Sequence, residues 1–439
     1  MKRELANYTV TPKIVLAGVE TGITIKPLGA HVVFKDNKYQ AMFVPMCMSR
    51  EPEYDYDVIP VCVSEDGCLR LKYVFSGEQE YMLRLFKEDA DLSDPKNYRY
   101  NKNNKMVICF SLYSLFEDLY ARRPYKGDLH AHSNASDGKE CPELTAANYR
   151  KNGFDLFALT DHYRYWPSVQ CKAYYDTKPV DFITFHGEEV HAPGNHVHII
   201  NFGGRYSINE MIEKDKEAYD REVRQLLDTL TVPEGIRSGY EYAACLWVFR
   251  KIREAGGLAI YAHPLWKSDA YHVPDALSDA LFRSGEFDAF ELLGGCTLYE
   301  NNLQTAYWNE KRAQGVNAAI VSSSDSHGSE DGDNWFKWAY SIVFSKGLEL
   351  ADVQEAIMKG YVGAVDKYPG NDARVHGSYR MTLYTQFLLE EYFPLHEELC
   401  FEEGRQMKAM FLGDEKAEEL LRLMRGRTAA LLKQYWGEN

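Results

Sequence analysis

The sequence has no long apolar run and no paired-cysteine motif. No stretch of 18 apolar residues occurs, so we expect no membrane-spanning helix. The nine cysteines are scattered without a CxxC motif, which is typical of reduced thiols in a cytosolic protein rather than of a disulfide scaffold. The first residues, 1–8, lack the apolar core of a signal peptide. We therefore expect a cytoplasmic protein that does not associate with membranes.

Basic residues are also scarce relative to acidic ones. The chain has 50 lysines and arginines against 65 aspartates and glutamates, and its formal net charge is −15. Such a charge repels polyanions, because binding to a duplex depends on basic side chains that neutralise phosphates. Nucleic-acid polymers are therefore disfavoured as partners, although bound metal ions can reverse the sign of the field locally. The chain also lacks repeats and glycine-rich loops that cradle a nucleotide.

The length and the hydrophobic pattern predict a multi-domain protein. A chain of 439 residues exceeds one ordinary core. Residues 1–122 alternate in short runs between turn residues, which predicts an accessory all-β sandwich that covers or oligomerises the next domain. In 123–380, apolar strands alternate with amphipathic helices, which predicts a parallel sheet or barrel. The charged segment 381–439 is expected to be a helical C-terminal extension that serves packing or oligomer contacts.

Particular segments carry these expectations. The strands of the first domain are expected at 13–19, 21–26, 31–34, 39–44, 58–63, 68–74, 81–86 and 106–112. The strands of the second domain are expected at 127–132, 156–161, 182–190, 197–202, 258–263, 289–293 and 318–323. The helices of the second domain are expected at 142–152, 240–255, 274–284, 300–314 and 349–359.

Histidine is concentrated in the second domain. Ten of the 13 histidines lie between His130 and His327, most of them beside an acidic residue or another histidine at the end of an apolar run. The blocks are DLHAHSNASDG (128–138), TDH (160–162), GEEVH (187–191), HVH (196–198), AHP (262–264) and SDSH (324–327). Residues i and i+2 of a strand share a face, so the two side chains of each H-x-H or D-x-H pair can coordinate one ion. Imidazole and carboxylate are the usual ligands of zinc, manganese and iron, and burying so many without metal would leave costly unsatisfied groups. A metal site is therefore the leading hypothesis.

The ordered blocks DLHAHSNASDG, TDH, GEEV, HVHIINFG, AHP and SDSH resemble those of the PHP family, the polymerase-and-histidinol-phosphatase group of metal-dependent phosphoesterases. The resemblance covers roughly residues 125–345, about half of the chain. It implies a distorted (β/α)7 barrel of PHP type with a two- or three-metal centre at its C-terminal mouth, here between the sandwich and the helical extension.

The resemblance also implies a set of metal ligands. The first ion would be held by His130, His132, Glu189 and Asp325. Glu189 would bridge to a second ion, which His198 and His263 complete. A third ion, in a trinuclear centre, would use Asp137, His162 and His327.

Some assignments remain open at this point. Glu188 could replace Glu189, although strand alternation lets only one of the two point inward. His196 could replace His198. The carboxylate of Asp137 favours a harder ion, manganese or iron, at its position. Two other histidines, His191 and His186, match no block of the family, so we expect them to be ordinary polar residues.

The implied reaction is hydrolysis of a phosphate ester by a hydroxide that bridges two metal ions. Asp161 could orient His162 or shuttle a proton, and Arg164 is the best-placed basic residue to stabilise negative charge. Further candidates for substrate binding are Trp166 and Lys267, and Arg374 with His376.

The expected substrate is a small phosphomonoester or a short nucleotide. A histidinol phosphate phosphatase is an alternative within the same class, and a 3′–5′ exonuclease is a weaker one, because no basic stripe flanks the site. A non-catalytic metal-binding interaction protein is the remaining alternative. A homo-oligomer is possible.

Overall fold

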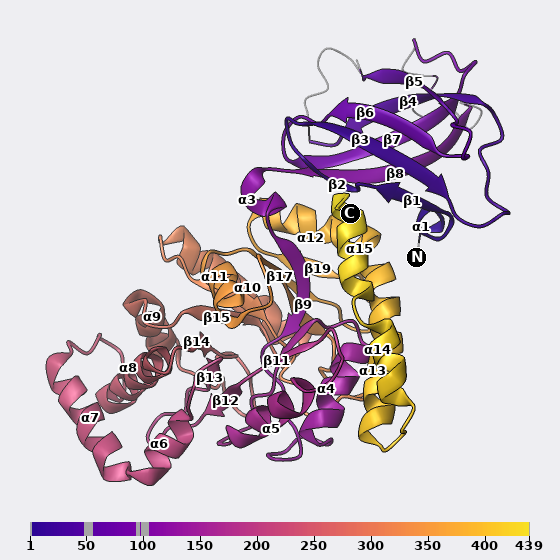
Figure 1. Ribbon diagram of the computed structural model, residues 1–439. Helices are drawn as coiled ribbons and strands as arrows, with labels where there is room; N and C mark the ends of the chain where they lie inside the picture. The colour runs from indigo at the N-terminus through magenta and orange to yellow at the C-terminus, as the bar shows by residue number, and fades with distance from the viewer. Residues whose placement is uncertain (1, 48–55, 94–96, 98–104, 439) are drawn as a thin grey trace. The chain divides into compact units, whose positions relative to one another are not determined.

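The structure is a computed structural model that describes residues 2–47, 56–93, 97 and 105–438 (Figure 1). The chain forms two compact units. The first contains Met1–Arg122, Leu383–Glu398 and Gly426–Asn439, and the second contains Arg123–Thr382 and Leu399–Arg425. The helical segment 381–439, predicted as an extension of its own, therefore contributes to both units.

The first unit contains two sheets that share one core. The three-stranded sheet has the order β1-β3-β6, and the five-stranded sheet has the order β2-β8-β7-β4-β5. Their strands are β1 Tyr8–Thr11, β2 Ile14–Leu16, β3 Glu20–Pro27, β4 Lys38–Pro45, β5 Val58–Cys62, β6 Leu69–Val74, β7 Gln79–Lys87 and β8 Met106–Leu115. Buried residues of both sheets, such as Ile25 and Leu83, pack in one cluster. The strand predicted at 31–34 is not formed.

The second unit contains two mixed sheets. One has the order β11-β10-β9-β17-β18-β19 and the other β12-β13-β14-β15-β16. The strands are β9 Arg123–Asp128, β10 Leu156–Ala158, β11 Ile183–Phe185, β12 Gly187–Val190, β13 Ile199–Phe202, β14 Leu258–Tyr261, β15 Ala289–Leu293, β16 Ala319–Ser322, β17 Ala339–Ser345, β18 Val362–Asp366 and β19 Arg374–His376. Apolar residues of both sheets, among them Leu156 and Ile260, form one core.

The prediction of a parallel sheet is correct for only part of this unit. Strands β9, β10 and β11 are parallel, as are β14, β15 and β16. Strand β13 is antiparallel to both β12 and β14, and β17 is antiparallel to β9. The segment 191–198 between β12 and β13 is too short for a parallel crossover, which needs roughly a dozen residues. The strand predicted at 182–190 is instead two strands, β11 and β12, which belong to different sheets.

The predicted helices of the second unit are confirmed to within two residues as α4 Pro142–Lys151, α8 Gly239–Glu254, α9 Asp275–Ser284, α10 Leu298–Ala313 and α11 Leu350–Met358. Their ends follow ordinary signals: proline opens α4, and a capping box of Thr297 and Glu300 opens α10. Helices that were not predicted in this unit are α5 Trp166–Tyr175, α6 Ile208–Lys214 and α7 Lys216–Thr229.

The remaining helices are α1 Arg3–Asn7, α3 Glu117–Tyr120, α12 Tyr379–Glu391, α13 Phe393–Phe411, α14 Ala417–Met424 and α15 Arg427–Trp436. Among the described residues, no helix has both the length and the apolar character needed to cross a bilayer.

Candidate metal centre

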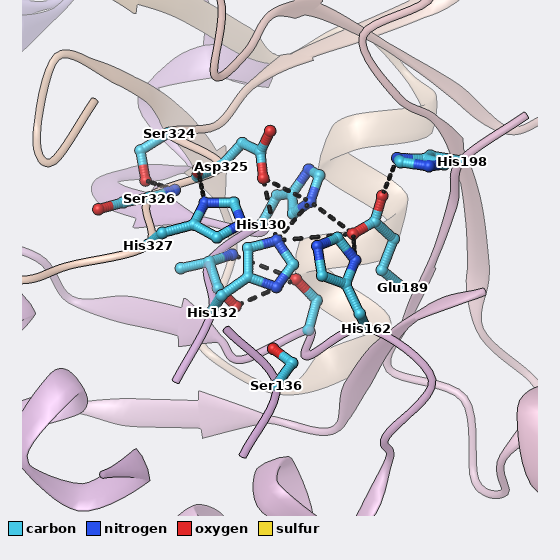
Figure 2. Close-up of polar contacts among 12 residues, drawn as sticks. His130, His132, Ser136, His162, Glu189, His198, Ser324, Asp325, Ser326 and His327 are labelled. Atoms are coloured by element: carbon cyan, nitrogen blue, oxygen red, sulfur yellow. Dashed lines mark hydrogen bonds and ion pairs between the residues drawn. The ribbon is translucent and has the colours of Figure 1, made fainter. Parts of the chain in front are cut away.

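The predicted metal ligands gather where strands of the two sheets of the second unit end (Figure 2). His130 and His132 directly follow β9, and His162 lies just beyond β10. Two isolated bridges, Ala131–Ser326 and His162–Glu189, join the two sheets at this place. Polar side chains from distant blocks of the sequence therefore face a common centre.

Glu189 lies at the middle of this cluster, and its side chain is 0% exposed. Its Oε2 atom lies 2.6 Å from His162 Nδ1, 3.5 Å from the Nε2 atoms of both His130 and His132, and 3.7 Å from His191 Nε2. Its Oε1 atom lies 2.6 Å from His198 Nδ1 and 3.6 Å from His263 Nε2. One carboxylate thus contacts two separate sets of imidazoles, as a bridging ligand would.

Asp325 provides the second buried carboxylate. Its Oδ1 atom lies 2.9 Å from His132 Nε2 and 3.2 Å from His130 Nε2, and its Oδ2 atom lies 3.8 Å from His263 Nε2. Asp325 has a φ of 50° and His263 a φ of 23°, in a region that side-chain-bearing residues rarely adopt. Strained residues of this kind cluster at functional sites, where the surrounding structure holds them in place.

Asp137 and His327 form the outer edge of the cluster. Asp137 Oδ1 lies 3.3 Å from His327 Nε2 and 3.6 Å from His162 Nε2, and the Asp137 side chain is 56% exposed. His327 Nδ1 lies 3.0 Å from the Asp325 carbonyl oxygen, to which it can donate its proton. That hydrogen bond leaves His327 Nε2 free to act as a ligand.

The ambiguities left by the sequence are decided by placement. The Glu188 carboxylate points away from the cluster and accepts hydrogen bonds from Ser207 Oγ, from the side-chain amides of Asn201 and Asn209, and from the Ile208 backbone. The His196 side chain is 83% exposed and pairs with Glu241. The structure therefore brings Glu189 and His198 to the centre and keeps Glu188 and His196 away from it.

Two buried acids that the sequence analysis left without a role support the cluster. Glu291, in β15, accepts a hydrogen bond from His130 Nδ1 at 2.9 Å and one from the His263 backbone at 3.2 Å. Asp128 accepts from the backbone nitrogens of His130 and Ser324. The sequence could have indicated a role for Glu291, because this residue is the one charged residue in the apolar run AFELL and a buried charge requires a partner.

The cluster is electrostatically polarised. Burial lowers the pKa of His162, but the carboxylates of Glu189 and Asp137 outweigh it and raise that pKa to about 9. Burial lowers the pKa of His198 to about 3 and that of His132 to about 4. Burial would raise the pKa of Glu189, yet the imidazoles of His198 and His162 hold it well below its usual range. The Glu189 carboxylate therefore remains ionised and attracts cations.

The donor set fits divalent metal ions. Within the described part of the chain, neither Glu189 oxygen receives a hydrogen bond, although ring nitrogens lie as close as 2.6 Å. A buried carboxylate without donors costs several kcal/mol, a cost that a cation would offset. Groups of mutually close ligand atoms are His132, Asp137, His162 and His327; His130, His132 and Asp325; His130, Glu189 and His263; and His162, Glu189 and His191. Nitrogen and oxygen donors of this kind suit zinc, manganese and iron.

The residues predicted to take part in catalysis are placed differently. The Asp161 carboxylate accepts hydrogen bonds from the Ser133 backbone and hydroxyl and from the Ser136 hydroxyl, so it orders the loop that follows His132. Arg164 and the further substrate-binding candidates Trp166 and Lys267 all have exposed side chains.

The last pair of candidates is engaged elsewhere in the second unit. Arg374 forms a double hydrogen bond with Asp366, which His376 also approaches at 3.7 Å. Both residues therefore belong to the contact between β18 and β19.

A pocket of about 420 Å³ borders the cluster on the side of Glu189 that faces His198. It is lined by Tyr163, His191, Ala192, Pro193, Asn195, His196, His198 and His272. His272, which lies outside the sequence blocks, packs edge-on against His198 with ring centroids 4.3 Å apart. Apart from Ala192 and Pro193, the described residues that line the pocket carry imidazole, phenol and amide groups, which suits an anionic ligand in an otherwise acidic protein.

No protein-family model matches the chain, and no curated protein matches it. Among solved structures, it is similar to a two-domain protein from Bacteroides vulgatus that contains a predicted PHP-like metal-dependent phosphoesterase, with 17% identity over 56% of this chain and a TM-score of 0.39. The chain spans 65% of the length of that protein.

Two further solved structures each match over 47% of this chain and 89% of their own length, at 18% identity. One is described as a metal-dependent phosphoesterase from Bifidobacterium adolescentis, with a TM-score of 0.34. The other is an amidohydrolase from Chromobacterium violaceum with bound sulfate and no metal, with a TM-score of 0.32.

Proposed function

We propose that this chain is a metal-dependent phosphoesterase of PHP type that hydrolyses a small phosphorylated substrate, either a phosphomonoester or a short nucleotide. The observation that carries the proposal is the buried Glu189 carboxylate, whose two oxygens lie among six imidazole rings and, among the residues that the structure describes, accept no hydrogen bond. A structural carboxylate would have the donors that Glu188 has.

The ligand assignment follows the sequence blocks and the contacts. His130, His132, Glu189 and Asp325 would hold one ion, and Glu189 with His198 and His263 a second. Asp137, His162 and His327 would hold a third. Divalent ions bound there supply Lewis acidity, which makes water a nucleophile near neutral pH and polarises a phosphate ester.

The residues of the chain prepare these ligands. Glu291 holds a proton on His130 Nδ1, so that Nε2 faces Glu189 and Asp325. Asp161 is a positioning residue that fixes the loop after His132 through Ser133 and Ser136. We propose that the leaving group binds in the pocket next to His198, and that the exposed Arg164 and Lys267 attract the anionic substrate.

The test is a phosphate-release screen on the full chain. Chelator-treated protein would be restored with manganese, zinc or iron and offered sugar phosphates, nucleotides, histidinol phosphate and an aryl phosphate. The proposal predicts metal-dependent release from one class, abolished by Asp325→Ala. Release that survives chelation or that substitution would contradict it. Binding of metal without turnover of any of these substrates would favour the non-catalytic alternative.

A further inference from the structure

His191 lies at the centre even though none of the blocks that resemble the family includes it. It follows β12 directly and stands two residues after Glu189, so both side chains point to the same face of the strand. His191 Nε2 lies 2.9 Å from His162 Nδ1 and 3.7 Å from Glu189 Oε2. With the 2.6 Å between His162 Nδ1 and Glu189 Oε2, these contacts bring three ligand atoms to one place.

The contacts of His198 differ from those of His191. His198 approaches Glu189 through Oε1, on the other oxygen of the carboxylate. Among the described residues, His198 belongs to no group of three mutually close ligand atoms, whereas His191 belongs to one. Ligand atoms are therefore grouped more closely on the side of Glu189 that faces His162 than on the side that faces His198.

The structure also holds His191 in position. Asn209, which is 3% exposed, accepts a hydrogen bond from the His191 backbone and donates one to the Glu189 carbonyl. Tyr163 packs against the His191 ring with centroids 4.4 Å apart, on a backbone with a φ of 58°. Fixed backbone and ring positions of this kind are what a ligand residue requires.

We infer that His191 is a metal ligand that, together with His162 Nδ1 and Glu189, holds an ion on the side of Glu189 that faces His162. A neutral imidazole has one free nitrogen, so the inference moves His162 to this ion from the one proposed at Asp137 and His327. The inference rests on the proposed metal-dependent function and adds a residue to its centre. His191 also lines the pocket of about 420 Å³, so its ring lies at the boundary between the pocket and this side of Glu189.

A simple hydrogen bond from His162 Nδ1 to His191 Nε2 is the competing explanation, and two substitutions separate the two. His191→Gln keeps an oxygen that can accept this hydrogen bond but loses the imidazole ligand. His191→Asp keeps a ligand that binds divalent metals. His196→Ala is the matched control, because His196 lines the same pocket and is 83% exposed.

The experiment titrates the metal-free full chain with Co²⁺ and follows the visible absorption of the ion and the bound equivalents by elemental analysis. We expect His191→Gln to lose one equivalent or to weaken one binding step by more than about 100-fold, beyond the roughly 10- to 100-fold typical of a lost supporting hydrogen bond. His191→Asp should retain that equivalent, and His196→Ala should match the native chain.

Unchanged stoichiometry and affinity in His191→Gln would overturn the inference and leave the proposed function standing. A native chain that binds no Co²⁺ would overturn both. The melting temperature of each variant in chelator shows whether the variant is folded. We expect the His191 variants to fold, because the His191 side chain is partly exposed (15%).

Discussion

Replacing Glu189 by glutamine should remove most of the stabilisation that metal ions give this protein. Saturation of one site at about 100 times Kd stabilises a native state by about 2.7 kcal/mol, which corresponds to a rise in melting temperature of about 3 to 5 °C for a protein of this size. Glu189 contacts both flanks of the cluster, so its charge attracts more than one ion. We therefore expect the rise on adding manganese or zinc to fall in Glu189→Gln to the part that an ion held without Glu189 supplies.

Glu188→Gln is the matched control, because the two glutamates are adjacent and both are 0% exposed. Glu188 accepts four hydrogen bonds, each worth about 1.5–3 kcal/mol when the acceptor is charged. Its replacement should lower the melting temperature with and without metal and leave the metal-induced rise intact. Scanning calorimetry on chelated and metal-restored samples gives both numbers. A full metal-induced rise in Glu189→Gln, or its selective loss in Glu188→Gln, would refute the reasoning.

Three further predictions follow from the same contacts. Glu291→Gln should weaken metal binding about 10- to 100-fold in a titration, because His130 loses its orienting carboxylate, and unchanged affinity would argue against that role. In Gly295→Ala, the added Cβ would lie 2.5 Å from Asp325 Cβ, so we expect metal loss and about 1–3 kcal/mol of destabilisation in urea unfolding; native behaviour would show that Asp325 can shift freely. In chelator, the raised pKa of His162 should stabilise the protein below pH 6.5, and this contribution should disappear as the pH rises through about 9; urea unfolding that is insensitive to pH in this range would contradict it.

The sequence predicted the positions of the site residues better than the path of the chain. The histidine blocks end apolar runs, and the structure places these ends together. The split of segment 182–190 into β11 and β12 was not predictable, because both halves are largely buried and His186 gives no turn signal. The direction of β13 was predictable in principle from the short segment that precedes it.

Supporting residues were missed because no metal-binding spacing marks them. Glu291 stands alone in an apolar strand, and Asp128 lies inside a block but faces the backbone of Ser324. His191 was set aside because no family block contains it, although its spacing from Glu189 placed both on one face. Conversely, Arg374 looked like a candidate for phosphate binding, yet its guanidinium is engaged by Asp366.

Metal content tests the central claim most directly. Elemental analysis of the full chain, after chelation, reconstitution with manganese, zinc or iron and removal of free ions, should find two or three ions per native chain and fewer in Glu189→Gln. A native chain without bound metal after reconstitution would contradict the account, because the buried carboxylates and imidazoles would then not be metal ligands.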